Sequence, residues 1–180
     1  MTDTHALGDL KKMVRDALQA DPNIKALSLA QQLNVKEAQA LGAYPQSCCA
    51  ELDALRAEQL IRELEKLGRA HVVVNSGAAI METFGEFKNF STAGPYLNVS
   101  SRDLHMHIYV KRIAKIFAVK KPLDVSAEPN CSLQFFNSEG DSAFKVFIHA
   151  QIPSRTLGLD QQVKVWEQLQ DEYRIGNDES

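Results

Sequence analysis

The stretch Leu104-His105-Met106-His107-Ile108-Tyr109-Val110, which Lys111-Arg112 follows directly, alternates apolar and polar side chains. Successive side chains of a β-strand point to opposite faces, so this pattern predicts a strand with one face in a hydrophobic core. The polar face would carry His105, His107, Tyr109 and Lys111. Imidazole is a common protein ligand for transition metals and for haem iron. The spacing alone also fits two solvated histidines on the open face of an antiparallel strand.

The chain before this strand is predicted to be helical as far as residue 69. Apolar residues recur every three or four positions, as on one face of a helix, in segments 7–18, 28–33, 36–44 and 53–67. Ser28 and Gln31 have the spacing of a capping box, which predicts that the second helix begins there. Asn34 suits a left-handed turn, and Gly68 suits a C-terminal cap.

After Gly68 the hydrophobic period changes to two, which predicts strands. The expected strands are 71–74, 79–84, 96–99, 104–110, 113–119, 132–137 and 143–149. A final helix is expected to be capped by Asp160 and to carry Trp166 and Tyr173 on one side. The predicted fold class is therefore α+β, with a helical N-terminal part (1–69) followed by an antiparallel sheet and a closing C-terminal helix (70–175). We expect both parts to form one structural domain.

Composition excludes several classes of protein. The chain has 180 residues, 44% of them hydrophobic and 24% charged, which is typical of a globular protein. A net charge of -3 gives no reason to expect nucleic acid or an anionic membrane as a partner. No apolar run exceeds four residues, so no membrane insertion is expected. The first twenty residues lack the apolar core of a secretory signal, and the three cysteines, which include the adjacent Cys48 and Cys49, form no C-x-x-C. These features predict a reduced, cytoplasmic protein.

Basic residues gather around the histidine strand. Residues 104–123 contain no acidic side chain but include Lys111, Arg112, Lys115, Lys120 and Lys121. Lysines at a strand edge can simply prevent edge-to-edge pairing. Alternatively, they form a basic wall for an anionic ligand. Haem would match both features, because its iron binds imidazole and its two propionates are anionic.

Other chemistries fit less well. The sequence contains no dinucleotide-binding glycine motif, P-loop, nucleophile elbow or H-E-x-x-H zinc motif. A zinc site needs three or four ligands, and beyond His105 and His107 the candidates are scattered. Residues 27–44 have helix-turn-helix spacing, but the recognition helix expected at 36–41 offers one basic and one acidic residue. We therefore do not expect DNA binding.

Four segments resemble a haem-utilisation superfamily: 94–99 (GPYLNV), 103–108 (DLHMHI), 133–140 (LQFFNSEG) and 144–147 (FKVF). Its single-domain members are haem carriers of the HutX/ChuX type, and its two-repeat members are haem-trafficking or haem-degrading proteins of the HemS/ChuS type. The likeness spans about residues 29–169, and the F-F-N-x-x-G hairpin is its most specific part.

The resemblance implies particular site residues. The family's histidine falls on His107, which would be the ligand of the haem iron, and the lysine after the hairpin falls on Lys145. His105 and Tyr109 would be neighbours of His107. Lys111, Arg112 and Lys145 would meet the propionates. Some carriers have a further histidine where this chain has Asn75, so the second axial ligand stays open. His71 and His149 are alternatives, and no role is assigned to Cys48 and Cys49.

The resemblance therefore implies a cytoplasmic carrier in haem-iron acquisition. It would pass haem b, or a haem-derived tetrapyrrole, from uptake machinery to a haem-processing enzyme. A homodimer is implied as well, because two copies would mimic the two-repeat relatives. The alternative function is that of a haem-degrading oxygenase. Two less favoured alternatives are a DNA-binding protein and a scaffold protein without a ligand.

Overall fold

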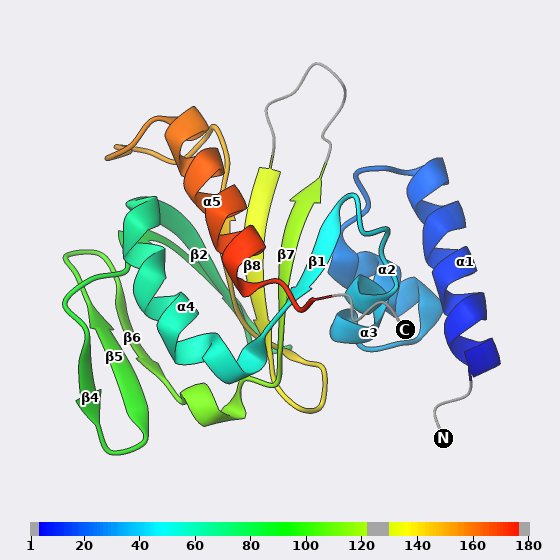
Figure 1. Ribbon diagram of the computed structural model, residues 1–180, viewed down its shortest axis with the longest axis horizontal. Coiled ribbons are helices and arrows are strands. Elements are labelled where there is room, and N and C mark those ends of the chain that lie inside the picture. The colour runs from blue at the N-terminus through cyan, green and yellow to red at the C-terminus, as the bar shows by residue number, and fades with distance from the viewer. Residues whose placement is uncertain (1–3, 122–129, 177–180) are drawn as a thin grey trace.

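The computed structural model describes residues 4–121 and 130–176 (Figure 1). Its helices are α1 (Thr4–Ala20), α2 (Ala26–Leu33), α3 (Glu37–Gly42), α4 (Ala57–Glu63) and α5 (Leu159–Tyr173), with 3-10 turns η1 (Ala54–Arg56), η2 (Leu64–Leu67) and η3 (Val110–Arg112). Its strands are β1 (Cys49–Leu52), β2 (Arg69–Asn75), β3 (Ile80–Glu86), β4 (Ser91–Ala93), β5 (Tyr96–Ser100), β6 (His105–Ile108), β7 (Lys115–Lys121), β8 (Asn130–Phe136) and β9 (Ser142–Ile148). None of the helices in these ranges is both long enough and apolar enough to cross a membrane.

The strands form two antiparallel sheets. The large sheet has six strands in the order β1-β7-β8-β9-β2-β3, and the small sheet has the order β4-β5-β6. Figure 1 shows the small sheet at one end of the molecule and helices α1–α3 at the other. The predicted α+β class, with an N-terminal helical part, an antiparallel sheet and a C-terminal helix, is confirmed.

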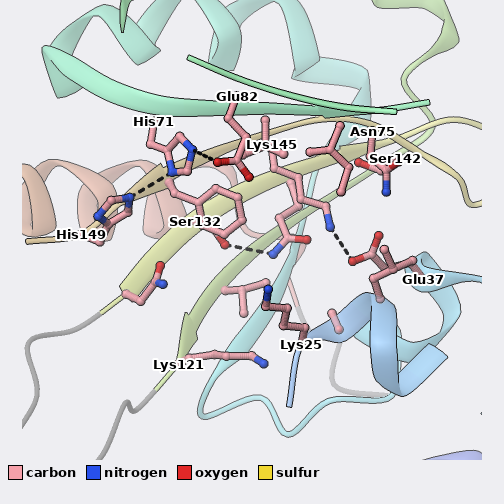
Figure 2. A pocket seen from close by; sticks show the side chains of 18 of the residues that line it. Lys25, Glu37, His71, Asn75, Glu82, Lys121, Ser132, Ser142, Lys145 and His149 are labelled. Atoms are coloured by element: carbon pink, nitrogen blue, oxygen red, sulfur yellow. Dashed lines mark hydrogen bonds and ion pairs between the residues drawn. The ribbon is translucent and has the colours of Figure 1, made fainter. Parts of the chain in front are cut away.

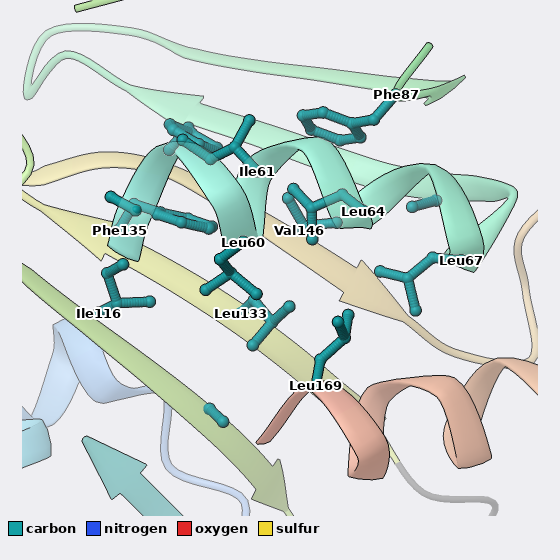
Figure 3. Packing of buried hydrophobic residues seen from close by; sticks show 14 of the residues in the cluster. Leu60, Ile61, Leu64, Leu67, Phe87, Ile116, Leu133, Phe135, Val146 and Leu169 are labelled. Carbon is teal, nitrogen blue, oxygen red and sulfur yellow. The ribbon is translucent and has the colours of Figure 1, made fainter. Parts of the chain in front are cut away.

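One face of the large sheet is covered by α4, η2 and α5 (Figure 3). Leu60, Ile61 and Leu64 are fully buried there, because their three- and four-residue spacing places them on one side of the helix. They pack into a cluster that includes Leu133 and Phe135 of the sheet and the inward side chains of β5 and β6. The small sheet therefore shares the main core through one face and leaves its other face outside.

The opposite face of the large sheet is covered in part by α1–α3, which we call the head. Val14, Leu29 and Leu41 of the head are buried in a second cluster with Phe117 and Phe136 of β7 and β8. The head thus covers the part of the sheet near β1, β7 and β8. The same face of β9 and β2 borders a cavity that is described below.

Some local predictions were wrong at element ends. Helix α2 begins at Ala26 rather than Ser28, because Leu29 N–H already bonds to Lys25 O. Helix α5 has Gly158 at its N-cap, and Asp160 lies inside its first turn. Asn34 (φ 53°) and Gly68 (φ 64°) do end their helices in left-handed or positive-φ conformations, as expected.

Two strands were not predicted at all. β1 lies inside the part that was expected to be helical, and β4 lies in a presumed loop. β1 is Cys-Ala-Glu-Leu and β4 is Ser-Thr-Ala, and segments this short, with Thr92 as their one β-branched residue, give little strand signal. They are strands because β7 and β5 offer them a neighbour to pair with.

Candidate functional site

The histidine strand has the two faces that its sequence predicts. Leu104 and Ile108 are buried, whereas His105 and His107 are exposed. In the small sheet, β5 pairs with β6 so that Asn98 lies opposite His107 and Ser100 lies opposite His105. The two imidazoles therefore stand on the outward face of the small sheet.

The strand pattern ends sooner than expected. β6 stops at Ile108, and the chain turns into η3, where Arg112 N–H bonds to Tyr109 O and Ile113 N–H bonds to Val110 O, both at 2.9 Å. The prediction that Tyr109 and Lys111 continue the polar strand face is therefore wrong in its geometry. The turn forms because the chain must leave the small sheet to enter β7 of the large one.

An aromatic pair lies next to the outward histidines. The Tyr109 ring meets the Tyr96 ring in an edge-on arrangement, with centroids 5.6 Å apart, and the Arg112 guanidinium lies 5.2 Å from the Tyr109 centroid. Tyr96 is 41% exposed. Sequence reasoning missed it, although its position two residues before Asn98 on a strand places both on one face.

The hydrogen bonding of His107 is specific. Its Nδ1 lies 2.6 Å from Asn98 Oδ1, and Asn98 Nδ2 lies 3.3 Å from Ser91 Oγ. An amide oxygen can only accept, so the bond places a proton on His107 Nδ1. The other ring nitrogen, Nε2, then carries a lone pair that a metal can bind.

The predicted basic wall is not one surface. Lys115 Nζ pairs with Glu51 at 3.1 Å, Lys120 Nζ pairs with Glu167 at 2.8 Å, and Lys121 Nζ donates to the carbonyl of Ile24 in the head. Alternation along β7 sends successive lysines to different faces, which separates them. Lys111 and Arg112 are exposed in η3 and form no ion pair among the described residues.

A cavity of about 480 Å³ lies between the head and the large sheet (Figure 2). Its wall contains Lys25 of the head and Lys121 and Lys145 of the sheet, together with apolar side chains such as Val73 and Phe147. Burial lowers the pKa of Lys121. The cavity thus offers apolar surface and three ammonium groups, which the carboxylates of Glu37 and Glu82 offset in part, and this combination suits an amphipathic anion.

Lys145 is committed to an ion pair inside this cavity. Its Nζ lies 2.5 Å from Glu37 Oε1, and the two side chains are only 13% and 5% exposed. The pair joins β9 to the first turn of α3 (Figure 2). Nearby, Lys36 pairs with Asp141 at 2.8 Å, and Gly140 lies so close to Lys36 that a Cβ on it would be 3.0 Å from Lys36 Cβ. The F-F-N-x-x-G hairpin between β8 and β9 therefore joins the head to the large sheet.

His71 and His149 also line the cavity, and they bind each other. Gln151 N–H donates to His149 Nδ1 at 3.2 Å, so the proton of a neutral His149 sits on Nε2 and points at His71 Nδ1, 3.0 Å away. His71 then carries its own proton on Nε2, which lies 3.4 Å from Glu82 Oε2. Burial and the nearby His71 lower the pKa of His149. With these tautomers, neither ring offers a lone pair to a metal.

The structure brings some of the predicted site residues together and separates others. His105, His107, Tyr109 and Arg112 belong to the small sheet and the turn that follows it. Lys145 lies on β9 of the large sheet, in a cavity to whose wall β4–β6 contribute no described residue. Asn75 lines this cavity as well. The candidate residues of one chain therefore fall into two separate groups, an outward histidine face on the small sheet and a basic cavity between the head and the large sheet.

Two sequence comparisons identify relatives of this chain. A family model described as "Haem utilisation ChuX/HutX" matches residues 50–169. The intracellular heme transport protein HutX of Vibrio cholerae serotype O1 is 27% identical over 141 residues, which cover 77% of this chain and 72% of HutX.

Two solved structures share the fold. The crystal structure of ChuX superposes with a TM-score of 0.74 at 19% identity and covers 88% of this chain and 96% of ChuX. Holo-PhuS, a heme-binding protein from Pseudomonas aeruginosa, superposes with a TM-score of 0.77 at 20% identity. That match covers 95% of this chain but only 46% of PhuS, so this chain corresponds to about half of the PhuS chain.

Proposed function

The chain belongs to the haem utilisation ChuX/HutX family, and from this premise we propose that it binds haem inside the cell and carries it to another protein. The relative HutX is an intracellular heme transport protein, and PhuS is a heme-binding protein. The cargo would be haem b, held by side chains of this chain, and the compartment would be the cytoplasm. The recipient would be an enzyme that processes haem.

The observation that supports this proposal most directly is the state of His107. Its side chain is exposed on a sheet face. Its Nδ1 is hydrogen-bonded to Asn98, so in the neutral ring Nε2 carries the lone pair. Ligand histidines almost always have the second ring nitrogen bonded in this way. We therefore propose that His107 Nε2 binds the haem iron and that His105, on the same face, does not.

The surroundings of His107 suit the rest of the haem molecule. The Tyr96–Tyr109 pair offers aromatic surface beside the imidazole for a flat macrocycle. Lys111 and Arg112 have no acidic partner among the described residues and are free to meet propionates. Lys145 would reach a propionate only after its bond with Glu37 breaks, so we place it second.

We further propose that two copies of the chain assemble. PhuS is about twice as long as the part that this chain matches, as expected if one PhuS molecule corresponds to two copies. The outward histidine face and the basic cavity are separate in one chain, and a second copy could bring them together around one haem. Sedimentation of the apo and haem-loaded protein tests this, and a monomer in both states would refute it.

Carriage and degradation of haem can be told apart by one set of experiments. The apo protein is titrated with haemin, and we expect a saturating Soret band at one haem per chain or per pair of chains. The loaded protein is then mixed with apomyoglobin, to which a carrier should release its haem intact. A reductant is added to a separate sample with catalase present. Loss of the Soret band there, rather than transfer, would indicate a haem-degrading enzyme.

A further inference from the structure

The pairing of β5 with β6 places Asn98 directly across from His107. Both side chains are on the outward face, because their neighbours Leu97 and Ile108 point into the core. The amide and the imidazole are therefore brought together by register alone, without help from a flexible loop. The resulting contact, 2.6 Å between Nδ1 and Oδ1, is slightly shorter than the usual range for such a bond.

This contact selects one tautomer of His107. A neutral imidazole carries its single proton on either Nδ1 or Nε2. With Oδ1 facing the ring, only the Nδ1–H form can make the bond, so the lone pair is on Nε2. The amide is held in turn by its Nδ2, which lies 3.3 Å from Ser91 Oγ on β4.

Three other imidazoles whose side chains the structure describes, those of His71, His105 and His149, lack this arrangement. His105 lies opposite Ser100, and no hydrogen bond to its ring is present there. His71 and His149 are bound to each other, and each ring has its acceptor nitrogen occupied. Among these four imidazoles, His107 is therefore the one whose outward nitrogen is prepared as an acceptor.

We propose that Asn98 is a positioning residue that fixes His107 in the Nδ1–H tautomer and so presents Nε2 to a metal. This inference rests on the proposed function for the identity of the metal, which is haem iron. Its tautomer part, however, concerns the free protein. Asn98 itself would not touch the haem, and it would act through the ring of His107.

The tautomer is tested without any ligand. In apo protein labelled with ¹⁵N, long-range ¹H–¹⁵N correlation spectra show which ring nitrogen carries the proton at a pH where the ring is neutral. We expect Nδ1–H for His107 in the wild type and in Asn98→Asp, whose carboxylate also accepts. In Asn98→Leu we expect a shift toward Nε2–H, which is the form that the neutral histidine side chain prefers in water. A wild-type His107 with its proton on Nε2 would overturn the inference.

Haem binding supplies the second readout. Loss of an outer partner of a ligand histidine typically weakens metal binding roughly 10- to 100-fold. We expect such a loss in Asn98→Leu, near-wild-type affinity in Asn98→Asp, and a different Soret position in the Asp variant, because a carboxylate makes the ligand more basic. Ser100→Leu is the control, since it places the same leucine side chain opposite His105, and it should bind haem as the wild type does.

The two possible failures are distinguishable. Equal losses in Asn98→Leu, Asn98→Asp and Ser100→Leu would show a general packing effect and would overturn the positioning role while leaving haem binding intact. If the wild type bound no haem, the proposed function would fail, and with it the presentation of Nε2 to haem iron. The NMR spectra of the apo protein would still decide whether Asn98 fixes the tautomer of His107.

Discussion

The ion pair between Lys145 and Glu37 gives a prediction that does not depend on any ligand. Its two side chains are 13% and 5% exposed, and it connects the head to the large sheet. Replacing Lys145 with methionine keeps much of the side-chain volume but leaves the Glu37 carboxylate buried without its partner. Removing one member of a buried pair typically costs about 3–5 kcal/mol.

Lys120 provides the matched control. It pairs with Glu167 at 2.8 Å, but the side chains are 41% and 48% exposed. Solvent-exposed pairs contribute about 0–1 kcal/mol, so Lys120→Met should change stability little. The same substitution should therefore cost about 2–5 kcal/mol more at position 145 than at position 120. The double variant Lys145→Met/Glu37→Leu should regain most of the loss, because replacing both charges with apolar groups is often neutral.

Urea unfolding measures these differences directly. The chain has one tryptophan, Trp166, which is 2% exposed in the main core, so its fluorescence reports unfolding. We expect the urea concentration at the unfolding midpoint to fall strongly for Lys145→Met and slightly for Lys120→Met. The dependence of the unfolding free energy on urea should be similar in both. A loss below about 1 kcal/mol for Lys145→Met, as for an exposed pair, would refute the reasoning.

Two further predictions concern charge. Because burial lowers the pKa of His149 from its ordinary 6.5, the unfolded chain binds more protons than the folded one just below that pH. The unfolding free energy should therefore decrease as the pH falls from about 7.5 to about 5.5. His149→Gln should make this decrease smaller. Equal dependence of the unfolding free energy on pH in both proteins would contradict the prediction. Charge reversal of Lys111 and Arg112 together should weaken haem binding more at low than at high salt, because exposed pairs are worth about 0.2–1 kcal/mol each and are screened. Lys115→Glu is the control, because Lys115 already pairs with Glu51. If Lys115→Glu weakened haem binding as much as the reversal of Lys111 and Arg112, the propionates would lie elsewhere.

The sequence was sufficient where the signal is local. The alternation around His105 and His107 predicts a two-faced strand because side chains of a strand alternate whatever its neighbours are. Gly68 and Asn34 are recognisable as helix ends because few residues tolerate a positive φ. Short strands such as β1 carry no such signal, since they exist only through their partners.

The site could be predicted only in part for the same reason. His107 was identified by resemblance, but its bond with Asn98 depends on the register of β5 against β6, which alternation does not fix. Lys145 and Glu37 are 108 positions apart, and their contact follows from how the head packs on the sheet. The His71–His149 pair likewise joins β2 to the residue that follows β9.

The central claim is that this chain binds haem iron through His107. It is tested most directly by spectrophotometric titration of the apo protein with haemin, in the wild type, His107→Ala and His105→Ala. We expect His107→Ala to shift the Soret band and to weaken binding at least about tenfold, which corresponds to about 1.4 kcal/mol. His105→Ala should retain the wild-type Soret position and lose less affinity. A His107→Ala variant with the wild-type spectrum and undiminished affinity would contradict the claim.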